Sequence, residues 1–204
     1  AYTGSSKGAC VKAEHTLCLM LRKPGLHMGQ GKELSGKVHF RSLISAAKLL
    51  KDNDPIEAIS WDKNTITRNL VAREQHQHKS SYGHSLIIAG QPGMLGAAMI
   101  AAEAALYSGC GKITVATHPS HAHMIYSSLP NVMVAPIKIA ADLIPYLKEA
   151  TQILVGPGLG CSAWSESILK TVCKYEKPLI LDADALNILA KNGKILQHSA
   201  ILTP

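Results

Sequence analysis

From about residue 82 to the end of the chain, short apolar runs alternate regularly with segments of helix length. The runs are rich in Ile, Leu and Val and are bounded by Gly, Pro or polar residues, which is typical of buried strands. We expect strands at residues 85–89, 112–116, 132–135, 152–155, 178–181 and 200–202. Because consecutive parallel strands need a crossover connection, strands separated by helices predict a mostly parallel sheet with helices on both faces. The predicted fold class is α/β, doubly wound.

The expected helices occupy the segments between these strands. We place them at residues 94–108, 120–129, 140–150, 164–175 and 185–190. The first is rich in Ala and apolar almost all round. A helix without a polar face is typically buried, so we expect residues 94–108 to be buried and closely packed.

The first third of the chain has a different organisation. Residues 11–21 are expected to form an extended strand that ends at the turn Lys23-Pro24-Gly25, and residues 36–40 a second strand. Residues 51–55, with the sequence KDNDP, form a polar break. We therefore predict one unit at residues 1–55, including a linker, and a second at residues 56–204.

Composition narrows the class of protein. Hydrophobic residues make up 47% of the 204, so the chain has enough apolar surface to fold, unlike a disordered tail. The sequence contains no run of about 18 apolar residues, so no membrane-spanning helix is expected. The net charge of +7 comes from basic residues spread along the chain, and aromatic residues are only 4%. We expect affinity for small anionic ligands but no nucleic-acid partner.

Cysteine and histidine usage points to a reducing compartment and to no resident metal ion. The five cysteines include no CxxC pair and are odd in number, which favours the cytoplasm over a disulfide framework. The ten histidines include two local groups, neither with the spacing of a known metal site. We predict that these groups are solvated loop residues: His76, His78 and His84, and His118, His121 and His123.

The first glycine-rich junction follows the strand predicted at residues 85–89. It runs from Gly90 through Gly93 to Gly96 and Ala97, where the apolar helix begins. Glycine lets backbone approach a ligand closely, and a helix N-terminus offers free N–H groups to an anion. The pattern is neither GxGxxG nor a P-loop, so neither nucleotide fingerprint fits. In an open α/β sheet this is nevertheless the edge where ligands bind.

Two further junctions at the same edge carry candidate residues. Gly156, Gly158 and Gly160 follow the strand at residues 152–155, and we favour ligand contact there over a merely sharp turn. Asp182 and Asp184 follow the strand at residues 178–181. Two carboxylates at such a position can bind Mg²⁺, hold a polar ligand or cap the next helix. For Asp184 the capping and functional alternatives stay open.

Taken together, these segments resemble the ADP/ATP-dependent NAD(P)H-hydrate dehydratase family, whose fold is ribokinase-like. The resemblance covers about residues 73–204, in the family's order and spacing. The matching segments are His78-Lys79-Ser80-Ser81-Tyr82-Gly83-His84, Gly93-Met94-Leu95-Gly96-Ala97-Ala98, Leu129-Pro130-Asn131-Val132-Met133-Val134, Gly156-Pro157-Gly158-Leu159-Gly160, Leu181-Asp182-Ala183-Asp184-Ala185-Leu186-Asn187 and Ile201-Leu202-Thr203-Pro204.

The N-terminal part resembles a second family, the closing segment of the NAD(P)H-hydrate epimerase domain. The matching residues are Thr3-Gly4, Val11-Lys12-Ala13, His15-Thr16 and Lys23-Pro24-Gly25. In bifunctional members the epimerase domain precedes the dehydratase domain. Both resemblances therefore imply the same repair of damaged nicotinamide nucleotides.

The resemblance implies a reaction and its participants. Hydrated NADH or NADPH (NADHX, NADPHX) loses water, driven by phosphoryl transfer from ADP or ATP with Mg²⁺, while the epimerase interconverts the two hydrate epimers. It implies small-molecule partners, no membrane, and a homo-oligomer. It also implies a hydrate pocket bordered or supported by Gly93, Gly96, Ala97, Gly156, Gly158, Gly160, Asp182, Asp184 and Asn187.

The sequence departs from the family pattern in places. Ser80 stands where the family usually has Gly, and Asn131 where an acidic residue is common. The family continues past the position of Pro204 into a His-Pro-Gly-Glu stretch, nucleotide-binding segments and a Gly-x-Gly-Asp motif that bears the catalytic Asp. We therefore expect the dehydratase fold to be incomplete at its C-terminus, the catalytic residues to lie beyond Pro204, and this chain alone to be inactive.

Two alternatives stay open on the sequence. The first is a small-molecule kinase of the same ribokinase-like superfamily. The second is a non-catalytic nucleotide-binding module, which would bind a hydrated nicotinamide nucleotide without turnover.

Overall fold

Six short apolar strands of the second half of the chain pair side by side in one parallel sheet. They are β3 (His84–Ile88), β4 (Lys112–Thr117), β5 (Met133–Pro136), β6 (Gln152–Val155), β7 (Leu179–Asp182) and β8 (Ala200–Thr203). Their order across the sheet is β5-β4-β3-β6-β7-β8, and every neighbouring pair is parallel. The six strands predicted from the sequence are thus confirmed, and so is the doubly wound α/β class.

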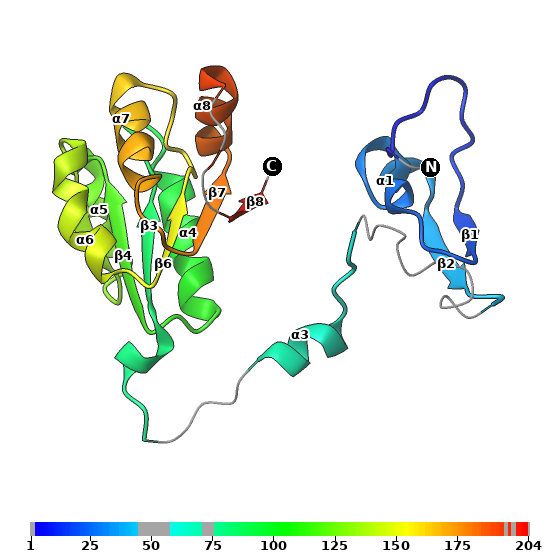
Figure 1. Ribbon diagram of the computed structural model, residues 1–204, viewed down its shortest axis with the longest axis horizontal. Coiled ribbons are helices and arrows are strands. Elements are labelled where there is room, and N and C mark those ends of the chain that lie inside the picture. Colours follow the sequence, from blue (N-terminus) through cyan, green and yellow to red (C-terminus); the bar gives the residue numbers. More distant parts are fainter. Residues whose placement is uncertain (1–2, 45–57, 71–75, 194–195, 197–198, 204) are drawn as a thin grey trace. The chain divides into compact units, whose positions relative to one another are not determined.

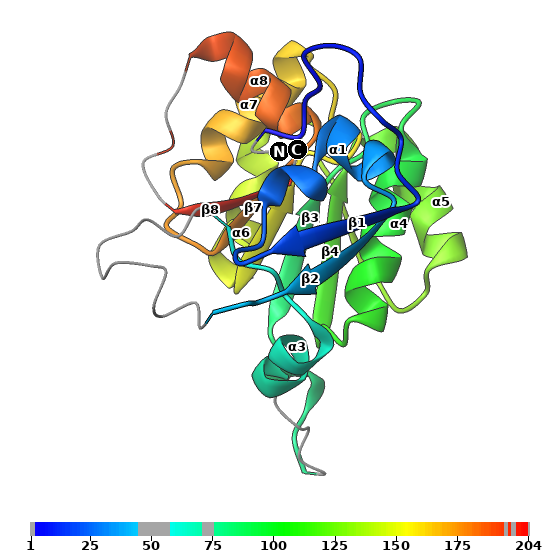
Figure 2. The same cartoon turned by 90° about the vertical axis from the view of Figure 1, so that its right-hand side faces the viewer.

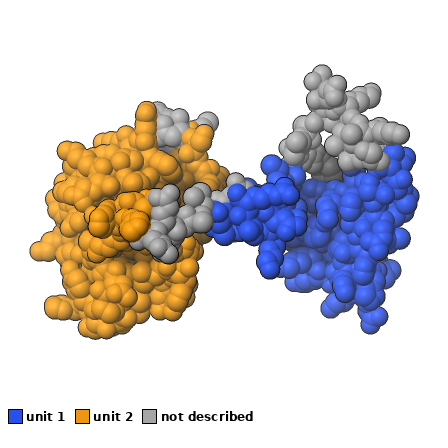
Figure 3. All heavy atoms as spheres, turned by 90° about the horizontal axis from the view of Figure 1, so that it is seen from below, with its two compact units in different colours: residues 1–72 blue, residues 73–204 orange. Residues whose placement is uncertain are grey.

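The structure is a computed structural model that describes residues 3–44, 58–70, 76–193, 196 and 199–203. It divides into two compact units, residues 1–72 and residues 73–204, coloured separately in Figure 3. The polar break predicted as a boundary, residues 51–55, lies outside the described residues. The predicted division at residues 55 and 56 stays a prediction.

Helices cover both faces of the sheet (Figures 1 and 2). One layer holds α4 (Leu95–Tyr107), η3 (Pro119–His121) and α5 (Ala122–Ser128). The other holds η4 (Ala140–Leu143), α6 (Ile144–Glu149), α7 (Ala163–Val172) and α8 (Asp184–Asn192). Among the described residues, no helix combines the length and the apolar character needed to span a membrane.

The core has two parts because side chains alternate across the sheet. All five residues of β3 are buried, which marks it as the central strand. Leu86 and Ile88 pack on the side of α6, α7 and α8, whereas Ile87 packs on the side of α4 and α5. The short turn η2 (Lys79–Tyr82) leads into β3.

The structure corrects the expectation that the apolar helix is buried all round. Helix α4 buries Ala98 and Ala102, whose small side chains lie one turn apart. On its outer side Ile100 is 69% exposed and Tyr107 is 90% exposed. The expectation is wrong because α4 forms a single layer on the sheet, so only one of its faces can be covered.

The first unit is a two-stranded parallel sheet with short helical connections. Strands β1 (His15–Leu19) and β2 (Lys37–Arg41) are joined through η1 (Pro24–Leu26) and α1 (Gly29–Leu34). The strand predicted at residues 11–21 is shorter than expected, and Val11 is 82% exposed. Helix α3 (Lys63–Asn69) begins after Asp62, whose side chain accepts a hydrogen bond from the Thr65 amide.

A buried histidine stands at the amino end of the central strand. The expectation that His84 and His121 are solvated loop residues is wrong, because His84 lies in β3, His121 lies in η3 and both are buried. The Nε2 atom of His84 lies 2.7 Å from Thr114 Oγ1. Burial lowers the pKa of His84 below its ordinary value of 6.5, and the nearby positive charge of Lys112 acts in the same direction. The folded protein therefore holds this imidazole neutral more strongly than the unfolded chain does.

This difference between the folded and unfolded states predicts that the protein is less stable at acidic pH. Because the unfolded chain takes up a proton near pH 6.5 more readily than the folded protein, the free energy of unfolding should fall as the pH drops below that value. Urea unfolding at pH 7.5 and pH 5.5 measures the loss. A His84→Gln variant, which does not titrate, should lose less stability over the same interval; equal losses in both proteins would contradict the assignment.

Candidate functional site

The strand order places the topological switch point of the sheet, where the chain reverses direction, between β3 and β6 at the carboxyl edge. Strands β3 and β6 are neighbours, but the chain leaves β3 toward β4 on one side and leaves β6 toward β7 on the other. At such a reversal the two following connections run to opposite sides of the sheet, and ligands of open α/β sheets bind there. The loops are the first two glycine-rich junctions, beginning at Gly90 and Gly156. The topology thus places both predicted junctions at the switch point (Figure 1).

Hydrogen bonds tie these junctions to one another. The Gly90 amide donates to Pro157 O at 3.1 Å, and the Gln91 amide donates to Gly158 O at 2.7 Å. On the other side of β3, Thr117 Oγ1 donates to Gly90 O at 2.9 Å. The ends of β4, β3 and β6 are therefore held as one surface.

The start of α4 is the open part of this surface. A Cβ built on Gly93 or Gly96 meets no other atom within 4 Å. The side chain of Met94, the residue before the helix, makes no capping hydrogen bond. The first backbone N–H groups of a helix have no intrahelical partner, and together with the helix dipole they favour an anion. Gly96 and Ala97 contribute two of these groups.

The glycines after β6 are required by packing. Gly158 has φ +55°, and a Cβ there would lie 2.9 Å from Met94 Cβ and 3.0 Å from Ala97 Cβ. Gly156 and Gly160 are buried; a side chain would collide with Asp182 O in the first case and with the Gln91 side chain in the second. At all three positions, packing within the turn is enough to require glycine, without any contact to a ligand. Ligand contact by Gly156, Gly158 and Gly160 stays a prediction, and Gly158 is the one beside Ala97.

The third segment joins the same surface through a carboxylate. Asp184 Oδ2 accepts a hydrogen bond from the Gly160 amide at 2.7 Å, and Asp184 Oδ1 accepts one from Asn187 Nδ2 at 3.3 Å. Asp182 Oδ1 instead accepts from Thr203 Oγ1 at 2.8 Å, which links β7 to β8. Asp184 is the first residue of α8, and the residue before that helix is Ala183. Asp184 thus positions the loop after β6.

Ala183 has a strained backbone at this edge. Its φ is +42° and its ψ is −109°, a conformation that residues other than glycine rarely adopt. This backbone conformation turns the chain sharply from β7 into α8 and brings the Asp184 carboxylate to the Gly160 amide.

The described residues do not fit a resident Mg²⁺ site. The carboxylates of Asp182 and Asp184 both accept hydrogen bonds from protein donors. Within the described part of the chain, no three His, Cys, Asp or Glu side chains gather as metal ligands would. His118 instead contacts Ser120 and the edge of the Trp164 ring.

Sequence reasoning missed two residues of this surface. Thr117 ends β4 and anchors Gly90 through its hydroxyl, and the Gln91 side chain lies against Gly160. Thr117 directly follows the strand predicted at residues 112–116, and Gln91 is the second residue after the strand predicted at residues 85–89. Those positions were the signal available in the sequence.

Known proteins are similar to this chain in sequence and in fold. The family model described as NAD(P)H-hydrate dehydratase matches residues 85–204, more than half of the chain. A bifunctional NAD(P)H-hydrate repair enzyme, Nnr, from Coxiella burnetii is 35% identical over 99% of this chain and 41% of its own length. The chain thus spans about two fifths of that relative.

Solved structures show the same fold. A ribokinase-like superfamily protein from Enterococcus faecalis is 26% identical with a TM-score of 0.65, covering 71% of this chain and 52% of that one. An ADP/ATP-dependent NAD(P)H-hydrate dehydratase from Bacillus subtilis, co-crystallised with ATP/Mg²⁺, is 28% identical with a TM-score of 0.59, covering 74% and 54%. The family match includes the sheet, both glycine-rich junctions and the carboxylates after β7, and by that match this ribokinase-like chain belongs to the NAD(P)H-hydrate dehydratase family.

Proposed function

We propose that residues 73–204 bind hydrated NADH or NADPH for a dehydratase that restores the reduced nicotinamide nucleotide. Membership of the family supports the reaction class. The observation that carries the proposal is the open start of α4, where Gly96 leaves uncapped backbone amides free of side chains beside the switch point between β3 and β6. Because the chain spans 41% of its bifunctional relative, the activity of the whole protein is part of this proposal.

The chemistry of the ligand matches that surface. A nicotinamide dinucleotide carries an anionic pyrophosphate, which helix N-terminal amides bind well. In the proposal Gly93, Gly96, Ala97 and Gly158 border the hydrate. The carboxylates and Asn187 hold the loops, with Asp184 bonded to the Gly160 amide and Asp182 bonded to Thr203. The net charge of +7 adds a weak general attraction for anions.

The nucleotide that drives the reaction is ADP or ATP. Transfer of its terminal phosphoryl group to the hydroxyl of the hydrate, with release of the hydroxyl proton, makes a better leaving group than hydroxide. Loss of phosphate together with a proton from the neighbouring ring carbon then restores the ring double bond. The Bacillus subtilis relative named above was co-crystallised with ATP/Mg²⁺. Since the described residues do not fit a resident Mg²⁺ site, magnesium in this proposal arrives with the nucleotide phosphates.

The first unit belongs, in this proposal, to the epimerase part of a bifunctional protein. The Coxiella burnetii relative matches 99% of this chain, so its similarity includes the first unit. Epimerisation there would convert the unreactive hydrate epimer into the one that the dehydratase uses. We place the protein in the cytoplasm, where reduced cysteines are stable, because its five cysteines are odd in number and include no CxxC pair.

We also propose that the protein is a homo-oligomer through the outer face of α4. Ile100, Ala104 and Tyr107 repeat at helical spacing on that face, and all three are exposed; the exposed Glu103 is the charged residue among them. An apolar helix face is stable when it is covered, and a second copy supplies a matching surface.

The ligand proposal predicts a selective loss at Gly96. Gly96→Val places a side chain over the first amides of α4 without a clash, so affinity for hydrated NADH should fall about tenfold or more, equivalent to about 1.4 kcal/mol, while the melting temperature stays unchanged. Isothermal titration calorimetry measures the affinity. Gly8→Val is the matched control and should bind normally. A Cβ at Gly8 also meets no other atom within 4 Å, and Gly8 lies in the first unit. Equal affinities of Gly96→Val and the unsubstituted chain for hydrated NADH would contradict the proposal that the ligand binds at the start of α4.

The oligomer proposal predicts dissociation by a charge on α4. Ile100→Lys should lower the sedimentation coefficient to that of a monomer, because burying the ammonium group at an interface is costly. Ile139→Lys is the control; it lies before η4 in the other helix layer and is 61% exposed. If the unsubstituted chain already sediments as a monomer, or Ile139→Lys alone dissociates it, α4 is not the interface.

A further inference from the structure

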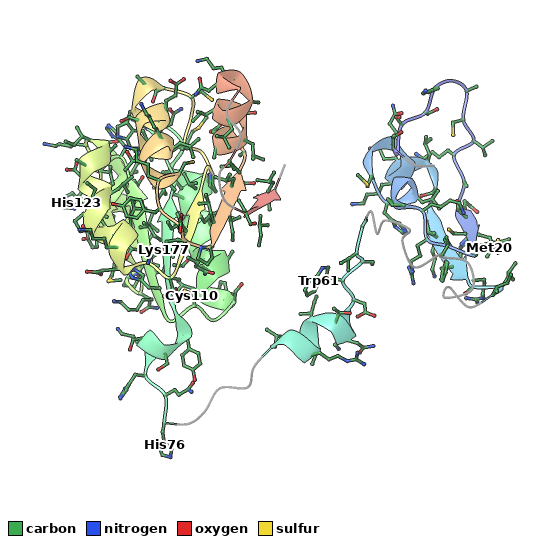
Figure 4. All side chains as sticks on the ribbon, viewed as in Figure 1. Met20, Trp61, His76, Cys110, His123 and Lys177 are labelled. Atoms are coloured by element: carbon green, nitrogen blue, oxygen red, sulfur yellow. The ribbon has the colours of Figure 1, made fainter. Side chains whose placement is uncertain are left out.

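A buried histidine lies beneath the first glycine-rich junction. His121 ends η3, directly after β4, and only 7% of its surface is exposed. It precedes α5, but its side chain makes no capping hydrogen bond to that helix. Unlike the exposed His123, which points outward from α5 in Figure 4, its imidazole is turned into the protein.

The Nδ1 atom of His121 is buried without a hydrogen-bond partner among the described residues. Buried polar atoms are nearly always paired, because an unpaired one has lost its water without a replacement. An exception in a folded protein therefore needs a cause, and one cause is a partner that arrives only in another state of the molecule.

The surroundings of Nδ1 identify the element that it faces. A Cβ placed on Gly90 would lie 3.7 Å from His121 Nδ1, 2.9 Å from Thr117 Oγ1 and 3.2 Å from Ala98 Cβ. Nδ1 thus faces the underside of Gly90, next to the first turns of α4. Gly90 is also the residue that bonds to both neighbouring strand ends, through Thr117 and Pro157.

We propose that His121 is a positioning residue of the turn between β3 and α4, whose Nδ1 gains its hydrogen-bond partner when that turn closes on the hydrated nucleotide. This inference rests on the proposed function. In the free protein the unpaired nitrogen costs free energy, and its pairing in the bound state adds to the affinity. Removing the nitrogen reduces the fraction of protein in the competent conformation, and the apparent affinity falls by that fraction.

Two substitutions separate the nitrogen from the volume of the ring. The side-chain amide of asparagine places a polar atom at about the position of Nδ1, and asparagine is favoured at a residue preceding a helix. Leucine fills space but offers no hydrogen bond. His121→Asn should therefore bind hydrated NADH within about threefold of the unsubstituted chain, and His121→Leu about tenfold more weakly. His123→Leu, two residues further on and exposed, is the matched control and should bind normally.

A measurement on the unsubstituted protein makes the test independent of how the variants fold. With the histidines labelled with nitrogen-15, the His121 Nδ1 resonance should move on addition of hydrated NADH, whereas the His123 resonances should not. Binding by the unsubstituted chain without that movement would overturn the inference alone. So would equal weakening by Asn and Leu, which would mean that only the ring volume matters, or normal binding by His121→Leu. No binding by the unsubstituted chain would overturn the proposed function together with the inference.

Discussion

The parallel hydrogen-bond ladder on both sides of β3 is the interaction on which the rest of the structure depends. Strand β3 pairs with β4 and with β6, and its five residues are all buried. Because those two neighbours belong to opposite halves of the sheet, the ladder places the switch point between β3 and β6 at the carboxyl edge. Gly90 continues it beyond the strand through bonds to Thr117 and Pro157, so the core and the candidate site share one framework.

The sequence predicts the sheet well because a strand buried on both faces has to be apolar along its length. That is why the buried central strands were found in order. Strand β8 was found from its apolar run alone, since Ile201 and Leu202 are 64% and 52% exposed. The same reasoning failed for α4. Its sequence is apolar on every side and so contains no signal of which side faces the sheet; the exposure of Ile100 and Tyr107 follows from the layer it occupies. The limits of β1 were also overestimated, because Val11 continues the apolar pattern without a strand to pair with.

The sequence predicts which segments form the site, but it does not predict which residues contact one another there. In the sequence, the glycine-rich junctions after β3 and β6 and the carboxylates after β7 indicated which edge of the sheet holds the site. The sequence could not separate glycines needed for packing from a glycine open to ligand: Gly156 and Gly160 are buried, whereas Gly96 is open. It also could not show that Asp184 serves the Gly160 amide, or that Nδ1 of His121 faces Gly90, because these pairs are distant in the chain.

The most direct test of the central claim, binding of the hydrate at the carboxyl edge, is a map of backbone amide shifts. Nitrogen-15 spectra of the chain are recorded with increasing hydrated NADH and with a matched concentration of sodium chloride. The account predicts that the largest changes fall on Gly96, Ala97 and Gly158, while Gly83 and Gly111 at the amino edge stay unchanged. Saturable shifts centred on the amino edge or on the first unit, with Gly96 and Ala97 unmoved, would contradict it.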